Sequence, residues 1–75
     1  MEVVFYGRLA EITGSTILRP EDITDTDQLK EKLLGLYPAM ADISFAIAVN
    51  NQIVQGNAAL RIGDTVALLP PFSGG

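Results

Sequence analysis

The spacing of hydrophobic residues changes along the chain, and its first part is typical of strands. Residues 2–6 (EVVFY) are rich in β-branched and aromatic side chains, which predicts a first strand. Gly7 ends that strand, RLAEIT predicts a short turn or helical stub, and Gly14 marks another turn. Residues 15–19 (STILR) predict a second strand that Pro20 ends, because proline cannot donate to a sheet ladder.

A helical period replaces this pattern in residues 25–38 (DTDQLKEKLLGLYP). Four large apolar side chains recur at i, i+4, i+7 and i+8 and share one helix face: Leu29, Leu33, Leu36 and Tyr37. This spacing predicts a single amphipathic helix of about three turns. The helix should end at Tyr37–Pro38, because a residue before proline avoids the helical conformation.

The start of this helix carries capping residues and negative charge. Asp25 with Gln28 three residues later resembles a capping box, and Thr26 is an equal candidate for the cap. Four acidic residues lie within 21–27, where they favour the positive end of the helix dipole. We therefore assign these carboxylates a structural role rather than a catalytic one.

An alternating pattern returns after the helix. In ISFAIAVN one face carries large side chains and the other small ones: Ile43, Phe45, Ile47 and Val49 against Ala46 and Ala48. Asn50–Asn51 tolerates a left-handed tight turn, and QIV (52–54) predicts a short strand. A loop at Gly56–Asn57 and a turn at Gly63–Asp64 lead into a last strand, 65–69.

The resulting order is β-β-α-β-β-β, which indicates the α+β class. One amphipathic helix over one mixed sheet buries all the apolar faces economically. A chain of 75 residues forms one domain. We divide it into a body, residues 1–69, and an extended C-terminal tail, residues 70–75.

Composition limits the partners. The net charge is −4, and the five cations are scattered along the chain, so nucleic-acid binding is not expected. The acidity suits a partner with a basic docking face, or it only keeps a small apolar protein soluble. No apolar run approaches the roughly 20 residues that span a bilayer, so no membrane partner is expected. The absence of cysteine and of a targeting segment fits a cytoplasmic protein.

Most catalytic chemistry is excluded by residue type. The chain has no histidine and no cysteine, so no imidazole base, thiolate nucleophile or metal site is expected. Its hydroxyl side chains lack a base partner, and GRLAEITG (7–14) lacks the lysine of a phosphate-binding loop. One group remains, the C-terminal carboxylate of Gly75. It becomes an acyl donor only when a partner activates it, for instance as a mixed anhydride with AMP.

The last six residues suit such a role. Pro70 and Pro71 lack an N–H group and favour a stiff, extended exit from the sheet. Phe72 can anchor in a partner's groove, and Ser73 joins it to the slender end. Gly74 and Gly75 have no Cβ and can pass a constriction that excludes other residues. We therefore predict that this tail carries the function.

At this point the sequence resembles a known family. FYGRLAEITG (5–14), AVNNQIV (48–54) and IGDTVALLPPFSGG (62–75) are similar to segments of the small, ubiquitin-like subunits of molybdopterin synthase. The resemblance runs nearly end to end and implies the β-grasp fold. Two positions depart from the pattern: Ala10 stands where many relatives have arginine, and Arg61 where relatives often have an acidic residue.

The resemblance implies a sulfur carrier without catalytic side chains or a bound cofactor. A partner adenylating enzyme uses ATP to charge Gly75, and a sulfur donor converts the adenylate to a thiocarboxylate. The large catalytic subunit of the synthase then transfers the sulfur to cyclic pyranopterin monophosphate within a heterotetramer. The resemblance also implies an apolar docking patch at Tyr6, Ile53 and Leu69, although each of the three is an equal candidate for the core.

Three alternatives stay open. A sulfur carrier of thiamine thiazole synthesis shares the fold and the diglycine, but its tail usually lacks the double proline. A ubiquitin-like modifier would join Gly75 to lysines of other proteins, but residues 68–73 carry no charge, unlike ubiquitin's basic tail. A plain interaction domain would use its tail for nothing.

Overall fold

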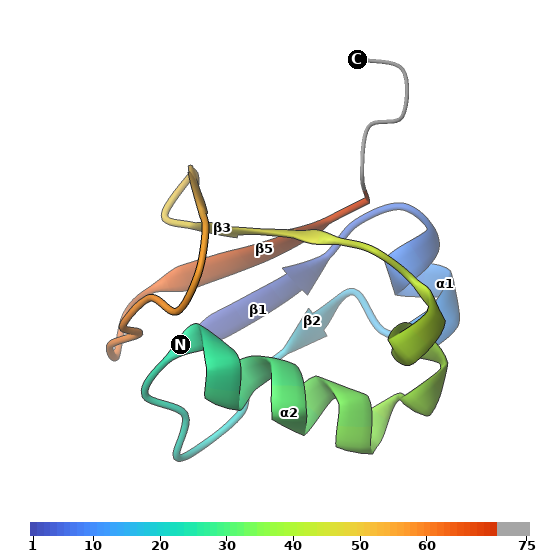
Figure 1. Ribbon diagram of the computed structural model, residues 1–75, viewed down its shortest axis with the longest axis horizontal. Coiled ribbons are helices and arrows are strands. Elements are labelled where there is room, and N and C mark those ends of the chain that lie inside the picture. Colours follow the sequence, from blue (N-terminus) through green and yellow to red (C-terminus); the bar gives the residue numbers. More distant parts are fainter. Residues whose placement is uncertain (71–75) are drawn as a thin grey trace.

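The computed structural model describes residues 1–70; residues 71–75 lie outside the described part. A five-stranded sheet forms one layer and the helix α2 lies beneath it, with the short helix α1 at one end of the sheet (Figure 1). The elements follow in the order β1 (Glu2–Phe5), α1 (Arg8–Thr13), β2 (Ile17–Leu18), α2 (Thr26–Leu36), the 3₁₀ helix η1 (Pro38–Asp42), β3 (Ala46–Val49), β4 (Gln52–Val54) and β5 (Thr65–Leu69).

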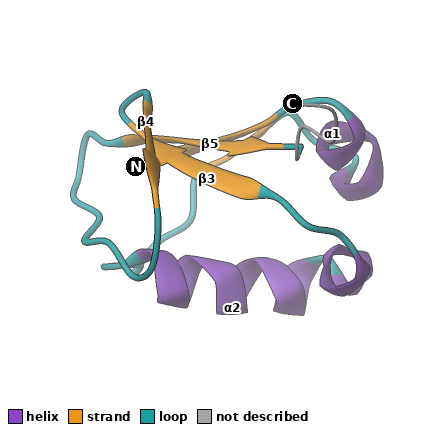
Figure 2. Ribbon diagram, turned by 45° about the horizontal axis from the view of Figure 1, so that its top comes forward, coloured by secondary structure: helices purple, strands orange, loops and turns teal. Residues whose placement is uncertain are grey.

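The sheet is mixed. Its strand order is β2-β1-β5-β3-β4, so the first and last strands of the chain are neighbours in the middle of the sheet. β1 and β5 run parallel, and the other three pairs are antiparallel. The view in Figure 2 shows the sheet and α2 as two separate layers. This arrangement confirms the predicted α+β architecture of one main helix over one mixed sheet.

The core fills the space between the two layers. The sheet contributes buried residues from three of its strands: Val3, Phe5, Ile47, Val66 and Leu68. Leu29 and Leu33 of α2 face them, and Leu9, Met40 and Leu60 close the edges. The ring of Tyr37 meets that of Phe5 edge to face, with centroids 5.9 Å apart. Phe5 and the other buried residues of the sheet therefore face α2, and the residues that alternate with them along each strand face away from it.

The predicted cap of α2 is Asp25. Its side chain accepts a hydrogen bond from the Gln28 N–H at 2.8 Å. The Gln28 side chain reaches one residue further back than a capping box requires, to the Thr24 N–H at 3.0 Å. Thr26, the alternative cap, is instead fully buried, and its hydroxyl accepts from the Ala58 N–H at 3.0 Å. This bond ties the start of the helix to the loop before β5.

Several sequence predictions need correction. Leu36 is not on the buried face of α2: 48% of it is exposed, because Tyr37 and the buried Met40 fill the core at that end. The predicted end of the helix, by contrast, is confirmed: α2 ends at Leu36, and Tyr37 leaves the helical conformation with φ −133° and ψ 80° before Pro38 opens η1 at a position that needs no N–H. Of the two alternatives for residues 8–13, the short helix is the one that forms, and Gly14 ends it at φ 72° as predicted. The second strand is confined to Ile17–Leu18, well within the predicted 15–19.

Candidate functional site: the exit of β5 and the outer face of the sheet

The tail leaves the body at the end of β5. Leu69 is the last residue of this strand and pairs with Ala46 of β3. Pro70 follows it and is half-buried. The other residues predicted to carry the chemistry, Pro71, Phe72, Ser73, Gly74 and Gly75, lie outside the described residues. Their roles therefore stay predictions, and the described part of the site is what surrounds Pro70.

One row of small and apolar side chains crosses the outer face of the sheet. The pairing register aligns one residue from each of the five strands: Ile17, Val4, Ala67, Ala48 and Ile53. Ile17 and Ile53 stand at the two edges and are 43% and 58% exposed, whereas Ala48 between them is buried. We call this set, together with Tyr6, Leu69 and Ala46, the outer apolar face.

Tyr6 and Leu69 lie in the next row, toward the exit of the tail. Phe5 pairs with Leu68, and the Tyr6 N–H donates to the Leu68 carbonyl at 3.2 Å, so the parallel register brings Tyr6 beside Leu69. Tyr6 is 49% exposed and Leu69 is half-buried. None of the residues Tyr6, Ile53 and Leu69 belongs to the buried core. The structure thus places all three on one face, and their docking role stays a prediction.

Ile17 extends this face in a way that sequence reasoning did not find. Ile17 lies in a strand of two residues, too short to show an alternating pattern. Only its pairing with Val4 reveals that it shares a face with Ile53, which lies four strands away. The available signal was the apolar pair Ile17–Leu18 between two polar segments.

The opposite end of the sheet is polar. Arg19 and Glu2 form an ion pair at 2.9 Å, and Glu2 pairs with Thr65 at the start of β5. Asn50 and Asn51 adopt the predicted left-handed turn, with φ of 50° and 70°. The outer face therefore changes from polar, where β5 begins, to apolar, where the tail leaves. A partner that docks through apolar contacts is directed to the tail's end of the sheet.

Asp64 lies at the polar end of the sheet, and the hydrogen bonds that its carboxylate accepts lower its pKa. The Asn50 side chain donates to one carboxylate oxygen at 3.0 Å and the Arg61 N–H to the other at 2.8 Å. These bonds, that from Asn50 first, lower the pKa of Asp64 below its ordinary value of 3.8. Asp64 is therefore the turn residue that the sequence predicted, and Arg61 contributes its backbone to that turn.

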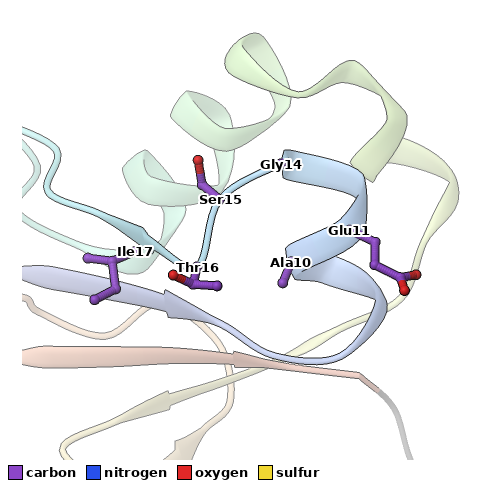
Figure 3. A pocket seen from close by; sticks show the side chains of 6 residues that line it. All are labelled: Ala10, Glu11, Gly14, Ser15, Thr16 and Ile17. Carbon is purple, nitrogen blue, oxygen red and sulfur yellow. The ribbon is translucent and has the colours of Figure 1, made fainter.

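A shallow hollow lies between α1 and β2 (Figure 3). Its lining includes Ala10, Gly14, Ser15, Thr16 and Ile17, and the carboxylate of Glu11 points away from it. The lining holds no pair of a nucleophile and a base, so we assign it no catalytic role. Ala10, one of the two departures from the family pattern, is one of the residues that line it.

Within residues 1–70, no three acidic side chains lie close enough together to hold a metal ion, and the chain has no histidine or cysteine that could add to such a group. None of the helices in this part is long and apolar enough to cross a membrane.

Comparisons with known proteins agree with this geometry. The model of the ThiS family matches residues 3–75. The human molybdopterin synthase sulfur carrier subunit is 35% identical over 83 aligned positions, which cover the whole of this chain and 93% of that protein.

Two solved structures are similar as well. SAMP1 from Haloferax volcanii superimposes with a TM-score of 0.80 at 27% identity, covering 99% of this chain and 97% of that one. A complex of subunits 1 and 2 of the molybdopterin-converting factor from Helicobacter pylori contains a chain with a TM-score of 0.65 at 30% identity, covering 99% and 96%. These likenesses confirm the β-grasp fold that the sequence resemblance implied.

Proposed function

The chain belongs to the ThiS family, and on that premise we propose that it is the sulfur-carrier subunit of a molybdopterin synthase. The similarity to the human sulfur carrier subunit over the full chain carries this proposal. The name of that human protein refers to molybdopterin synthesis, which favours the pterin pathway over the thiazole alternative. The double proline at 70–71 favours it as well. The chain supplies the carrier and no catalytic side chain, so the large subunit provides the catalysis.

The chemistry centres on the carboxylate of Gly75. The free carboxylate resists nucleophiles, so a partner adenylating enzyme first joins it to AMP and releases pyrophosphate from ATP. A donor of sulfur at the oxidation level of sulfide then attacks the acyl carbon. AMP leaves with the bond electrons, and Gly75 becomes a thiocarboxylate.

The sulfur next moves to cyclic pyranopterin monophosphate. The thiocarboxylate sulfur bonds to a side-chain carbon of the pterin, and the carbon–oxygen bond there breaks with its electrons leaving on the oxygen. Water then attacks the acyl carbon of Gly75, the acyl carbon–sulfur bond breaks with its electrons staying on the sulfur, and the Gly75 carboxylate is restored. Two loaded carriers supply the two sulfurs of the dithiolene. We place this step in the active site of the large subunit, which the carrier enters with residues 70–75.

The body of the protein supports this role by its surface. The outer apolar face carries Tyr6 and Leu69 next to Pro70, so a partner bound there lies beside the base of the tail. The complex of subunits 1 and 2 from Helicobacter pylori supports a large subunit as that partner. The net charge of −4 suits a basic docking surface.

Intact-mass spectrometry tests the proposal directly. The chain is incubated with an adenylating enzyme, ATP and a sulfide donor, and one oxygen of the Gly75 carboxylate should be exchanged for sulfur. The loaded carrier, mixed with the large subunit and the pterin precursor, should yield molybdopterin. A variant that lacks Gly75 should fold and bind the large subunit as before but form no product.

The outcomes separate the alternatives. Full molybdopterin synthesis by the variant without Gly75 would remove the proposed site. Sulfur loading followed by transfer to a thiazole precursor alone would favour the thiamine carrier. Conjugates of higher mass in cell extracts, joined through Gly75 to lysines, would favour a protein modifier. Absence of any loading would leave a plain interaction domain.

A further inference from the structure

Gly7 lies against the residue at which the tail begins. A Cβ atom added to Gly7 would stand 3.3 Å from Cγ and 3.9 Å from Cδ of the Pro70 ring. Contacts as short as 3.3 Å are rare for Cβ atoms, so the neighbouring group must shift to accept one. Of the described glycines, Gly7 alone has an atom within 4 Å of such a Cβ. The glycine therefore leaves room for Pro70 where it now sits.

The backbone around Gly7 is held in place from two sides. The Tyr6 N–H donates to the Leu68 carbonyl at 3.2 Å, which joins the end of β1 to the end of β5. The Tyr6 carbonyl accepts from the Leu9 N–H at 3.2 Å and that of Gly7 from the Ala10 N–H at 3.1 Å, which joins the same turn to α1. Gly7 itself has φ 59° and ψ −134°, a conformation that side-chain-bearing residues avoid.

We infer that Gly7 is a positioning residue for the tail: the β1–α1 turn forms a fixed seat for Pro70 and sets the direction in which residues 71–75 leave the sheet. This inference rests on the proposed sulfur-carrier function, in which that segment must reach a partner's active site. Pro70 is suited to such a seat, because its ring has one fixed φ and makes no ladder hydrogen bond.

The length of the tail makes this seat matter. The five residues after Pro70 span at most about 17 Å when extended. A tilt of roughly 10° at the base moves the end of such a span by about 3 Å. Reacting atoms must be placed much more closely than that, and a misplacement of about 1 Å can cost about 100-fold in rate. A small shift of Pro70 should therefore slow sulfur transfer while leaving docking intact.

The main test compares Gly7→Ala with Gly63→Ala. Both glycines have positive φ, 59° and 94°, but the space beside Gly63 is open, and Gly63 precedes β5 at the end far from Pro70. Each variant is prepared as the thiocarboxylate by sulfide cleavage of an intein thioester, which bypasses the adenylating enzyme. Single-turnover transfer to the pterin precursor is then measured with the large subunit in saturating amount.

We expect Gly7→Ala to slow transfer by at least about tenfold with an unchanged Kd for the large subunit. Gly63→Ala should lower the melting temperature but transfer sulfur at the normal rate. Equal rates for Gly7→Ala and the natural chain, or equal losses in both variants, would overturn the inference. A natural chain that transfers no sulfur would instead contradict the proposed function, so the two failures are distinguishable.

Two further variants separate crowding from backbone strain. Pro70→Ala removes Cγ and Cδ, so the effect of Gly7→Ala on the rate should be smaller in the Pro70→Ala background.

If Gly7→Ala does not fold, total chemical synthesis supplies D-alanine at position 7. D-alanine accepts positive φ and directs its Cβ away from Pro70, so the synthetic chain should transfer sulfur normally. If Gly7→Ala slows transfer equally with Pro70 and with Ala at position 70, or if the D-alanine chain transfers sulfur slowly, the inference that Gly7 positions Pro70 is wrong.

Discussion

The Asn50 side chain donates a hydrogen bond of 3.0 Å to a carboxylate oxygen of Asp64 and accepts one of 3.0 Å from the Thr65 N–H. One amide thus joins the turn between β3 and β4 to the start of β5. The Asn50 N–H adds a bond of 2.8 Å to the Thr65 carbonyl. This cluster holds the polar end of the sheet together, at the end of β5 opposite the exit of the tail.

The first prediction concerns acid. The bonds from Asn50 and Arg61 lower the pKa of Asp64 in the folded chain, so its contribution to stability is complete above pH 3.8. Below pH 3.8 the unfolded chain takes up the proton first, and the contribution is lost as the pH falls through the lowered pKa. Asp64→Asn should destabilise the fold at pH 7 and reduce this acid-dependent loss. Urea midpoints from pH 7 to pH 2 measure the difference.

Asp42→Asn is the control for this experiment. Asp42 is exposed, and within residues 1–70 no side-chain hydrogen bond involves it. This variant should change the urea midpoint far less than Asp64→Asn does. If the urea midpoints of Asp64→Asn and the natural chain differ by the same amount at every pH, the Asp64 hydrogen bonds do not cause the acid-dependent loss of stability.

The second prediction uses two leucines of α2 that the sequence pattern treats alike. Leu33 is fully buried and Leu36 is 48% exposed. Leu33→Ala should lower the free energy of unfolding by about 2–5 kcal/mol, because it leaves a cavity in the core. Leu36→Ala should cost about 1 kcal/mol or less, since little packing is lost. Chemical denaturation of both variants checks this, and similar losses would show that Leu36 belongs to the core.

The third prediction concerns the cap of α2. Asp25→Ala removes the acceptor of the Gln28 N–H bond and should lower the free energy of unfolding by about 1 kcal/mol. Asp25→Ser keeps an acceptor and should restore most of the loss. Thermal denaturation followed by circular dichroism measures both. If serine does no better than alanine, the cap is not what stabilises this end of the helix.

The fourth prediction tests the outer apolar face with two exposed isoleucines. Ile53 lies on that face, and Ile62, which is 99% exposed, lies in the turn before β5. Ile53→Lys should weaken binding to the large subunit by at least about tenfold, because a charge would be buried at the interface. Ile62→Lys changes the net charge equally and should leave the Kd unchanged. Isothermal titration calorimetry distinguishes them, and equal effects would point to charge rather than location.

Local patterns were sufficient for much of the fold. The helical spacing of Leu29 and Leu33, the Asp25 cap and the left-handed turn at Asn50–Asn51 each depend on residues a few positions apart. Interactions at this range belong to the local chain, so a sequence reports them directly. The pattern was wrong about Leu36, because exposure at a helix end depends on which other residues reach the core there.

The sequence by itself determined the five strands and the main helix, their order, and the chemistry left to a chain without histidine or cysteine, because these follow from residue type and short spacing. Only the tertiary structure decided which residues share a surface. The row from Ile17 to Ile53 depends on the register of all four strand pairs. The closeness of Gly7 to Pro70 depends on the pairing of β1 with β5, which lie near opposite ends of the chain. Their register is set by packing of the whole sheet on α2, which no short stretch of sequence contains.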